Sequence, residues 1–404
     1  MNCIRRGTAM RVLMVSTEYP PMTGGIGRYT SNLTKALQKQ GLEVYVVCDD
    51  KGDGNFSGIS PENKQNSEVL LKIVEKLKPD LVHIQFDPGM YGLMLKTTMM
   101  SRTGGTYIDS FYHKCKTPII TTFHSAYTLR EWIKNAFLTK RVGRTGRLGV
   151  PARMAVTAWK RFLNYSSFHN LNREKLELSR SGIVFSHYMH NLLGGGEIIY
   201  HGADPAISDN PNKNEARAFF SLSREVPREE FKTHRIVLAL GFKTATKGWN
   251  ILEKMHIPDG WTMVVNSSKG YYNTENIELR WNKPSNKKSV IDIQRGYLSD
   301  EELSMLFYAS DAVVLPYSIT SGSGVMFDAL AHGLPFVATD LEFFREFSSQ
   351  NLGITVKRNP ASFSKGLQEL HKNYSKYAQA VNDFKGKLKW SNVAKEHLKI
   401  YEKG

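Results

Sequence analysis

Hydrophobic and polar positions alternate in blocks along the chain, with short apolar runs followed by longer amphipathic stretches. In the first half, strand-like runs occur at residues 10–17, 42–48, 80–86, 118–124 and 182–187. Runs that are apolar throughout and rich in Val, Ile and Leu are typical of strands buried in a parallel sheet. Between them, Leu33, Ala36 and Leu37 follow a helical spacing, which predicts a helix over 29–40 that ends at Gly41.

The same alternation returns in the second half. Strand-like runs occur at residues 235–242, 261–267, 290–297, 312–317 and 335–340. Ser299, followed three positions later by Glu302, has the spacing of a capping box and predicts the start of a helix. Repeated alternation of strands and helices favours parallel sheets covered by helices on both faces. We therefore expect the α/β class, with two Rossmann-like, doubly wound domains that face a central cleft.

A segment rich in Gly, Pro, Asn and Asp, residues 196–215, separates the two halves. At 404 residues the chain is also too long for one ordinary domain. We expect one domain at 10–200 and a second at 201–385, with a C-terminal helix at about 386–404 that packs back on the first. Open parallel sheets bind ligands at the carboxyl ends of their strands, so the loops at these ends are the candidate sites.

Composition excludes several classes of protein. Apolar residues make up 41% of the chain and charged residues 23%, as in globular domains. No apolar run approaches the roughly 20 residues that a membrane-spanning helix needs, and the basic start lacks a signal-peptide core. Three widely spaced cysteines, Cys3, Cys48 and Cys115, suggest a reducing compartment without disulfides or a zinc site. We expect a cytoplasmic protein.

The formal net charge of +16 is the strongest signal of the composition. Basic proteins favour partners that carry phosphate, such as nucleotides, nucleic acid or anionic lipid. Residues 128–175 hold eleven Lys and Arg against two Glu, more than half of the net charge. Large apolar side chains interleave with these charges: Trp132, Phe137, Leu138, Trp159, Phe162 and Leu163. The segment either lies on an anionic membrane surface, at the inner face of the membrane, or packs its aromatics in the core.

A glycine-rich loop precedes an apolar helical stretch in the second half. The loop comprises Thr320, Ser321, Gly322, Ser323 and Gly324. Glycines let backbone N–H groups approach an anion closely, and a helix that begins near Ser323 adds the positive end of its dipole. The loop is therefore either a diphosphate site that needs no metal or simply a tight turn.

Other polar residues are candidates for the same chemistry. Asp328 lies about one turn into that apolar helix, where it either accepts hydrogen bonds from a ribose or pairs with a basic side chain. Lys243 and Lys247 follow the strand 235–242 and either neutralise a diphosphate or are exposed surface lysines. His124 ends a first-half strand and either faces the cleft or is structural.

Taken in order, these motifs resemble family 4 of the retaining nucleotide-sugar glycosyltransferases, which have the GT-B fold. The matching segments are MRVLMVSTEYPPMTGGIGRYTSNLTKALQKQGLEVYVV, TTFHS, IIYHGAD, GFKTATKG, GYLSDEELSMLFYASDAVVLPY and SGSGVMFDALAHGLPFVATD. They cover nearly the whole chain in the order and spacing of the family. The resemblance implies a donor site in the second domain and an acceptor side in the first.

The resemblance also implies roles by position. Gly24 and Gly25 match a glycine loop that lines the donor phosphate and the acceptor. His124 matches the histidine beside the transferred sugar, and Lys247 the lysine on the donor diphosphate, which makes these two the expected catalytic residues. Asp328 matches the second acid of the family's Glu-x7-Glu motif, which usually holds the ribose.

Two departures from the family pattern affect the sugar and phosphate contacts. Thr320 stands where the first glutamate of the motif usually contacts the sugar ring. The N–H groups of Ser323 and Gly324 would take over part of that contact. The usual arginine before the lysine is missing, and Lys243 is the nearest substitute. These changes fit a divergent transferase or a degenerate one.

From these features we expect transfer of a sugar from a UDP- or GDP-type nucleotide-sugar to a hydroxyl acceptor, with retention at the anomeric carbon. The leaving diphosphate would take the acceptor proton, because the sequence shows no catalytic carboxylate pair of the hydrolase type. No metal and no other cofactor is expected, since no Asp-x-Asp motif lies near these loops. The acceptor would be a glycan or a lipid-linked precursor of a polysaccharide.

Three rival functions remain open at the level of sequence. The first is a non-catalytic sugar-nucleotide binder of the same fold, which the missing glutamate motivates. The second is another enzyme of this fold, such as a nucleotide-sugar epimerase or a phosphorylase. The third is a nucleic-acid binder, but the chain has no recognition-helix or stacking-aromatic pattern, so nucleic acid is not an expected partner.

Overall fold

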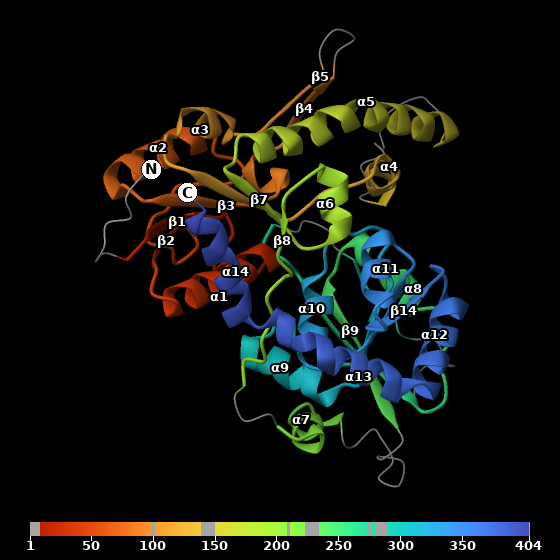
Figure 1. Ribbon diagram of the computed structural model, residues 1–404. Helices are drawn as coiled ribbons and strands as arrows, with labels where there is room; N and C mark the ends of the chain where they lie inside the picture. Colours follow the sequence, from red (N-terminus) through yellow and green to blue (C-terminus); the bar gives the residue numbers. More distant parts are fainter. Residues whose placement is uncertain are drawn as a thin grey trace. The chain divides into compact units, whose positions relative to one another are not determined.

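The computed structural model describes residues 9–97, 102–138, 150–207, 211–222, 234–272, 277–279, 281 and 289–403 (Figure 1). The chain forms two compact units. The N-terminal unit consists of Met1–Gly202 with Trp390–Gly404, and the C-terminal unit of Ala203–Lys389. The chain therefore crosses between the units at 202/203 and 389/390, where we had expected 200/201 and 385/386.

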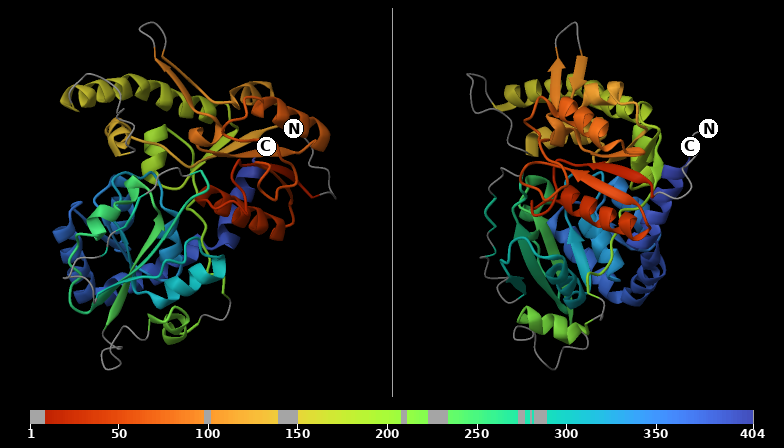
Figure 2. Two further views of the ribbon diagram at one scale, coloured as in Figure 1. Left: turned by 180° about the vertical axis from the view of Figure 1, so that it is seen from behind. Right: turned by 90° about the vertical axis from the view of Figure 1, so that its left-hand side faces the viewer.

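The N-terminal unit, seen from two further sides in Figure 2, contains a parallel sheet. Its six strands follow the order β2-β1-β3-β6-β7-β8. The strands are β1 (Arg11–Val15), β2 (Glu43–Val47), β3 (Leu81–Phe86), β6 (Ile119–Phe123), β7 (Ser181–Val184) and β8 (Glu197–Ile198). β3 and β6 are buried along their whole length, as their continuous apolar character predicts. The expected run 182–187 is divided, because Ser186 caps helix α6 (His187–Leu193) and His187 is already helical.

Helices cover this sheet, and the C-terminal helix is one of them. They are α1 (Gly25–Lys39), α2 (Asn66–Leu77), α3 (Asp109–Lys114), α4 (Leu129–Leu138), α5 (Val150–Glu177), α6 and α14 (Trp390–Glu402), with the short η1 (Pro88–Tyr91). α14 packs against α1. A hairpin of β4 (Met94–Thr97) and β5 (Arg102–Gly105), which the sequence pattern did not suggest, packs on α5.

The C-terminal unit has a second parallel sheet, in the order β11-β10-β9-β12-β13-β14. Its strands are β9 (Arg235–Phe242), β10 (Trp261–Ser268), β11 (Val290–Asp292), β12 (Ala312–Leu315), β13 (Phe336–Thr339) and β14 (Gly353–Val356). Its helices are α7 (Lys213–Phe219), η4 (Ala245–Lys247), α8 (Trp249–Leu252), α9 (Asp300–Ala309), α10 (Gly324–Ala331), α11 (Glu342–Ser348), α12 (Pro360–Lys372), α13 (Tyr374–Phe384) and η6 (Lys385–Leu388). The predicted class, two α/β units with doubly wound parallel sheets, is confirmed.

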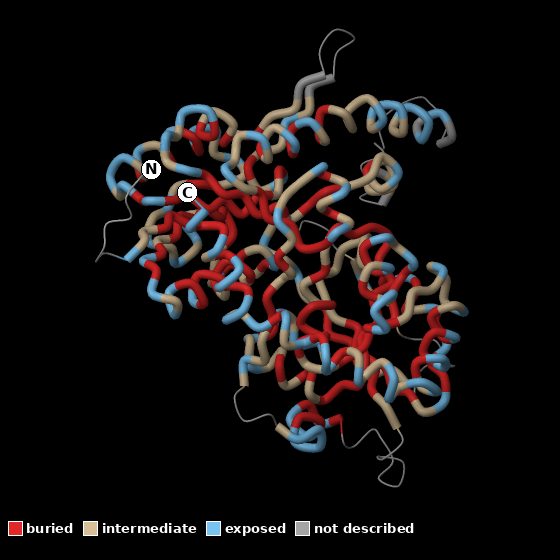
Figure 3. Tube along the Cα trace, viewed as in Figure 1, coloured by how far each residue is buried: buried red, intermediate tan, exposed pale blue. Residues whose placement is uncertain are grey.

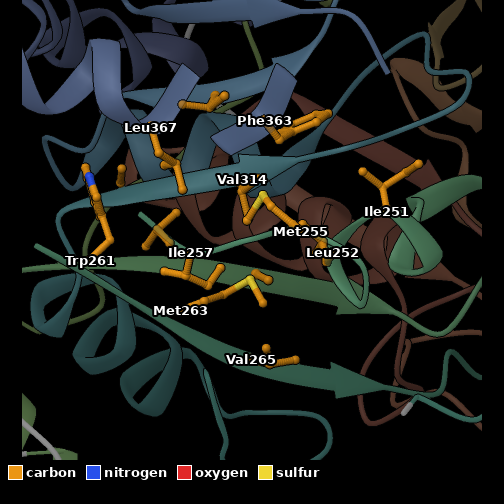
Figure 4. Packing of buried hydrophobic residues seen from close by; sticks show 14 of the residues in the cluster. Ile251, Leu252, Met255, Ile257, Trp261, Met263, Val265, Val314, Phe363 and Leu367 are labelled. Carbon is orange, nitrogen blue, oxygen red and sulfur yellow. The ribbon is translucent and has the colours of Figure 1, made fainter. Parts of the chain in front are cut away.

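The core of the C-terminal unit shows why these runs form strands (Figure 4). Met263 and Val265 of β10 pack with Val314 of β12 on one face of the sheet, against α8 and against Phe363 and Leu367 of α12. All five side chains are almost fully buried. Each such side chain contributes roughly 1.5–3 kcal/mol of transfer free energy, so this layer holds the loops at the ends of the strands in place.

Strand order identifies where each sheet is expected to bind ligands. In the C-terminal unit the order reverses between β9 and β12, and in the N-terminal unit between β1 and β3. At such a switch point the two following loops diverge to opposite faces and leave a crevice at the carboxyl ends of the strands. The loop after β9 contains Lys247, the loop after β12 contains residues 320–324, and the loop after β1 contains Gly24.

Candidate functional site

In the C-terminal unit, the loops that follow β9 and β12 are joined to each other. The amide of Ser318 donates to the carbonyl of Thr246 over 2.9 Å. Gly248 has a φ of +76°, and a side-chain Cβ at this position would lie 2.0 Å from the carbonyl oxygen of Pro316. Only glycine allows both that conformation and that approach. The lysine loop and the segment before the TSGSG loop therefore form one rigid structure at the switch point.

Lys247 is held at this junction. Its ammonium nitrogen lies 3.9 Å from the centre of the Tyr317 ring, a cation–π contact. Tyr317 is almost fully buried, and its hydroxyl accepts a hydrogen bond from Ser323 Oγ over 3.4 Å. The structure thus brings Lys247 and the TSGSG loop together through one tyrosine, which sequence reasoning did not single out.

The TSGSG loop itself forms the start of α10. The side chain of Ser323 caps the helix by accepting from the amide of Met326 over 3.2 Å. Thr320 Oγ1 accepts from the amide of Gly322 over 3.2 Å, so the threonine that replaces the family's glutamate shapes the loop. Ser321 and Gly324 complete the loop, and Ser321 is buried. The helix begins at Gly324, one residue after the expected start.

Asp328 lies on the same helix, in its second turn. It is buried, as are its neighbours Phe327 and Ala329. The ribose contact that the resemblance implies for Asp328 stays a prediction. His332 and Gly333 then end the helix, the glycine with a φ of +82°.

Lys243 faces different surroundings from Lys247. It lines a pocket of about 510 Å³ at the carboxyl ends of β9, β10 and β11. Lys269, Glu278 and Asp292 also line this pocket, and Asp292 accepts a hydrogen bond from the indole of Trp281. A pocket with two cations and two acids suits a neutral polar group better than a phosphate.

The glycine loop of the N-terminal unit is occupied by a carboxylate of the protein. Glu18, which is buried, accepts hydrogen bonds from the amides of Ile26 and Gly27, in the first turn of α1. A Cβ at Gly24 would lie 1.7 Å from this carboxylate, whereas one at Gly25 would touch nothing within 4 Å. A side chain at position 24 would therefore displace the Glu18 carboxylate, and α1 begins at Gly25 because this carboxylate satisfies its first amides.

Burial of Glu18 also affects its ionisation. Desolvation raises the pKa of this carboxyl, and the hydrogen bonds from the α1 amides oppose that shift. A side-chain oxygen of the protein itself thus occupies these two amides. The role that the resemblance implies for Gly24 and Gly25 at the phosphate thus stays a prediction, while their contacts here are with Glu18 and α1.

His124 lies at the end of β6, half-buried in an aromatic cluster. Its ring is 5.3 Å from that of Tyr29 and 5.2 Å from that of Phe185, both edge-on. Nε2 of His124 is 2.9 Å from Oε1 of Gln85 on β3. Burial, with His201 nearby, lowers the pKa of His124 to about 3. The imidazole is therefore neutral at physiological pH.

The aromatic side chains of the basic segment 128–175 lie in two different environments, the core and the surface. Trp132 of α4 is buried, and its ring stacks on Phe168 of α5 at 4.3 Å. Trp159 and Phe162 of α5 are exposed. Residues 139–149, which carry Lys140, Arg141, Arg144 and Arg147, lie outside the described part of the chain. One aromatic of the segment thus lies in the core and two lie on the surface, and contact with a membrane stays a prediction.

Other observations concern metals and membranes. Among the described residues, no group of three or more His, Cys, Asp or Glu side chains is arranged to hold a metal ion. Within the same residues, no helix has the length and apolar character that crossing a bilayer requires.

Comparison with known proteins gives the family. A model of Glycosyltransferase Family 4 matches residues 23–167, and a model of Glycosyl transferases group 1 matches residues 272–373. Together they cover more than half of the chain, with one match in each unit. The chain belongs to the family 4 glycosyltransferases. In the first unit the match includes the loop with Gly24 and Gly25, His124, α4 and most of α5. In the second unit it includes the TSGSG loop and Asp328.

Relatives of this glycosyltransferase agree with the assignment. An uncharacterized glycosyltransferase from Methanocaldococcus jannaschii is 22% identical, over 97% of this chain and 98% of its own length. Sucrose-phosphate synthase from Thermosynechococcus elongatus is similar in structure, with a TM-score of 0.66 at 15% identity over 97% and 98% of the two chains. The Anabaena protein HepE, solved with UDP-glucose, has a TM-score of 0.60 at 11% identity over 96% and 98%. The expected GT-B fold is thus confirmed.

Proposed function

We propose that this glycosyltransferase moves a sugar from a UDP- or GDP-type nucleotide-sugar to a hydroxyl acceptor, with retention at the anomeric carbon. The observation that carries the proposal is the joined pair of loops after β9 and β12. It sets the Lys247 ammonium beside Tyr317 and Ser323, at the N-terminus of α10. A cation and a helix N-terminus on one rigid structure suit a diphosphate.

The two halves of the donor would bind in different surroundings. The diphosphate fits Lys247 and the amides at the start of α10, including those of Ser323 and Gly324. The nucleoside fits the pocket beside Lys243, whose Glu278 and Asp292 would accept hydrogen bonds from base or ribose but would repel phosphate. Asp328, on α10, would hold the ribose. HepE, which shares the fold, was solved with UDP-glucose, and this supports a UDP-type donor.

Chemistry would rest on positioning and charge stabilisation. Lys247 would neutralise the negative charge that develops on the leaving diphosphate. The diphosphate would accept the acceptor proton on the face that it leaves, which yields retention. His124 would contact the transferred sugar as a neutral hydrogen-bonding group, because its low pKa leaves it uncharged. We propose that no metal is needed, since Lys247 and the dipole of α10 supply the positive charge.

The acceptor would be a glycan or a lipid-linked sugar, as in the synthesis of a polysaccharide precursor. A lipid-linked acceptor requires the enzyme to work at a membrane. The basic residues of 128–175 support this location, since they favour an anionic surface at the inner face of the membrane. We therefore propose a cytoplasmic protein that binds the membrane peripherally.

Turnover of nucleotide-sugars tests the proposal. The purified protein is incubated with UDP-, GDP- and ADP-sugars, a lipid-linked glycan fraction and either EDTA or Mg²⁺, and the release of nucleoside diphosphate is measured. We expect release from one nucleotide series, undiminished by EDTA, and a product with the anomeric configuration of the donor by NMR. Binding without release from any donor would favour the degenerate protein. Conversion of the sugar while it stays attached to the nucleotide would favour an epimerase.

A further inference from the structure

The long helix α5 consists of two differently buried halves. In its C-terminal half, Ser167, Phe168, Leu171, Asn172 and Lys175 are buried against the rest of the N-terminal unit. Its N-terminal half is exposed over most of its circumference, as the pale blue segment at the free end of α5 shows (Figure 3). The helix is therefore anchored at one end and projects at the other.

The projecting half carries large apolar side chains. Met154 is 45% exposed, Val156 44%, Trp159 61% and Phe162 48%. Within the described residues, eight large apolar side chains are exposed, and four of them lie on this one stretch. Trp159 and Phe162 also stack on each other at 5.8 Å. Scattered apolar residues are normal on a surface, but a concentrated group marks an interaction site.

Basic residues accompany this apolar group. Lys160 is exposed beside Trp159, and Arg161 lies with its guanidinium 4.6 Å from the centre of the Trp132 ring, at the α4 contact. No Asp or Glu occurs between Glu131 and Glu174. A second copy of this basic surface would be repelled, whereas an anionic surface is complementary. Aromatic and basic residues on one exposed helix are typical of helices that lie in a membrane interface.

We propose that the N-terminal half of α5 docks on an anionic lipid surface through Trp159 and Phe162, with Lys160 contacting the headgroups. Docking would bring the enzyme to the membrane that contains the proposed lipid-linked acceptor. This purpose of the docking rests on the proposed function. The binding itself needs no donor, so it is tested without nucleotide. Its failure is thus separate from a failure of transferase activity.

Vesicle sedimentation tests the docking. The full chain is mixed with vesicles of phosphatidylcholine alone or with about one-third phosphatidylglycerol. We expect binding to the anionic vesicles only, weakened by added salt. The double change Trp159→Ala/Phe162→Ala should reduce the partition coefficient about tenfold or more, and Lys160→Glu should reduce it less. Phe219→Ala, at a site in the other unit that is 46% exposed, is the matched control and should have no effect.

Three results would overturn this proposal. The first is equal binding of wild type and the double variant to anionic vesicles. The second is no binding by the wild type while nucleotide binding is intact. The third is a change of oligomeric state in the double variant, by analytical ultracentrifugation, without a change in vesicle binding, which would make this surface a contact between copies.

A second inference rests on a separate observation, a chain of hydrogen bonds inside the N-terminal unit. His83 Nδ1 lies 2.5 Å from the hydroxyl of Tyr401 on α14. Gln85 Nε2 lies 3.3 Å from His83 Nε2 and donates to Met14 Sδ over 3.2 Å. With its NH₂ group used in this way, Gln85 presents its oxygen to His124 Nε2.

This series of hydrogen bonds determines which ring nitrogen of His124 carries the proton. An amide oxygen only accepts, so His124 must donate from Nε2, and in the neutral ring Nδ1 is then an acceptor. We infer that Gln85 is a positioning residue that selects this tautomer and leaves Nδ1 to accept from a sugar hydroxyl. The sugar contact rests on the proposed function, whereas the tautomer does not.

Nitrogen NMR of the histidine rings tests this role without substrate. The ¹⁵N shifts should show His124 of the wild type as the Nε2–H tautomer, and Gln85→Leu should produce a mixture of tautomers. In a separate assay with substrate, which rests on the proposed function, Gln85→Leu should lower kcat at similar KM. Gln85→Glu keeps an acceptor, so it should keep the tautomer and raise the pKa of His124 into an observable range. His201 and His83, two imidazoles that interact with His124, should be assigned separately. An unchanged tautomer in Gln85→Leu, with only a lower melting temperature, would overturn the proposal.

Discussion

At the scale of single residues, Glu18 determines what the first glycine loop can do. Its carboxylate fills the start of α1 and lies where a side chain at Gly24 would have to go. We predict that Gly24→Ala destabilises the protein by about 1–3 kcal/mol, the usual cost of overpacking. Gly25→Ala, one residue further and unobstructed, should be neutral or stabilising because alanine favours helices. Thermal denaturation of both variants measures the difference.

The double variant Glu18→Ala/Gly24→Ala is the control for this mechanism. Removal of the carboxylate should recover part of the loss caused by Gly24→Ala, since the clash is with that group. Equal melting temperatures for Gly24→Ala and Gly25→Ala would contradict the account.

Burial of Glu18 predicts a pH effect on stability. Because its pKa is raised in the folded state, the unfolded chain releases this proton first as the pH rises. The contribution of Glu18 is thus fully present below its unfolded pKa and declines as the pH rises through its folded value. We predict that Glu18→Gln gains stability relative to wild type as the pH rises above about 4.5, the ordinary pKa of a glutamate, measured as the difference in melting temperature. A constant difference over this range would contradict the assigned burial.

Some residues of the candidate site could be predicted from the sequence and others could not. Lys247 and the TSGSG loop were recognisable because glycines and a lysine at strand ends have a local pattern. Glu18, Gln85 and Tyr317 were not, because their partners are distant in the sequence or their role is defined only by packing. Gln85, for example, lies in an apolar strand. Its role is defined only by its contacts with His83 and His124, and through His83 with Tyr401.

At the scale of elements, buried charges join helices to the second sheet. Asp311, just before β12, pairs with the buried Arg217 of α7 over 2.8 Å and with Lys213, and accepts from the amide of Ile236 on β9. We predict that Asp311→Ala costs about 3–5 kcal/mol of unfolding free energy, because it leaves Arg217 buried without its carboxylate. The control Asp340→Ala breaks an exposed pair with Arg345 and should cost about 1 kcal/mol or less. Similar losses for the two variants in urea denaturation would contradict this prediction.

Elements that have a local sequence signal lie where the sequence predicts them, whereas elements whose bounds depend on tertiary contacts differ from the prediction. The capping box of Ser299 and Glu302 is present at the start of α9. Helix α1 begins four residues before the expected Tyr29, because Glu18 caps it from outside the helix. β11 ends at Asp292, far short of residue 297. In the β4–β5 hairpin, Gly104 packs on the backbone of α5, a contact that no local pattern reveals.

At the scale of the molecule, the C-terminal helix completes the N-terminal unit. Tyr401 of α14 is buried there and hydrogen-bonds to His83 of β3. We predict that Tyr401→Ala destabilises this unit by about 3–5 kcal/mol. Hydrogen exchange should show faster exchange in β1, β3 and β6, while β9, β10 and β12 keep their protection. Equal acceleration in both sheets would mean that the two units unfold as one.

The two-unit architecture was predictable because both halves repeat the same strand and helix pattern. The crossings at 202/203 and 389/390 were displaced from expectation by a few residues, since contacts rather than composition set them. His201 lies in the segment 196–215, which we expected to separate the two domains, yet its ring packs on Tyr29, Phe185 and Trp390 of the N-terminal unit.

The central claim is that the C-terminal unit binds the donor diphosphate at Lys247 and the start of α10. The most direct test is calorimetric titration of UDP, GDP and ADP into the full chain, with Lys247→Ala and the exposed Lys372→Ala as matched variants. We predict that one nucleotide binds to wild type and to Lys372→Ala with equal affinity, and at least about tenfold more weakly to Lys247→Ala. Equal affinity for all three proteins, or no binding of any nucleotide to the wild type, would contradict the claim.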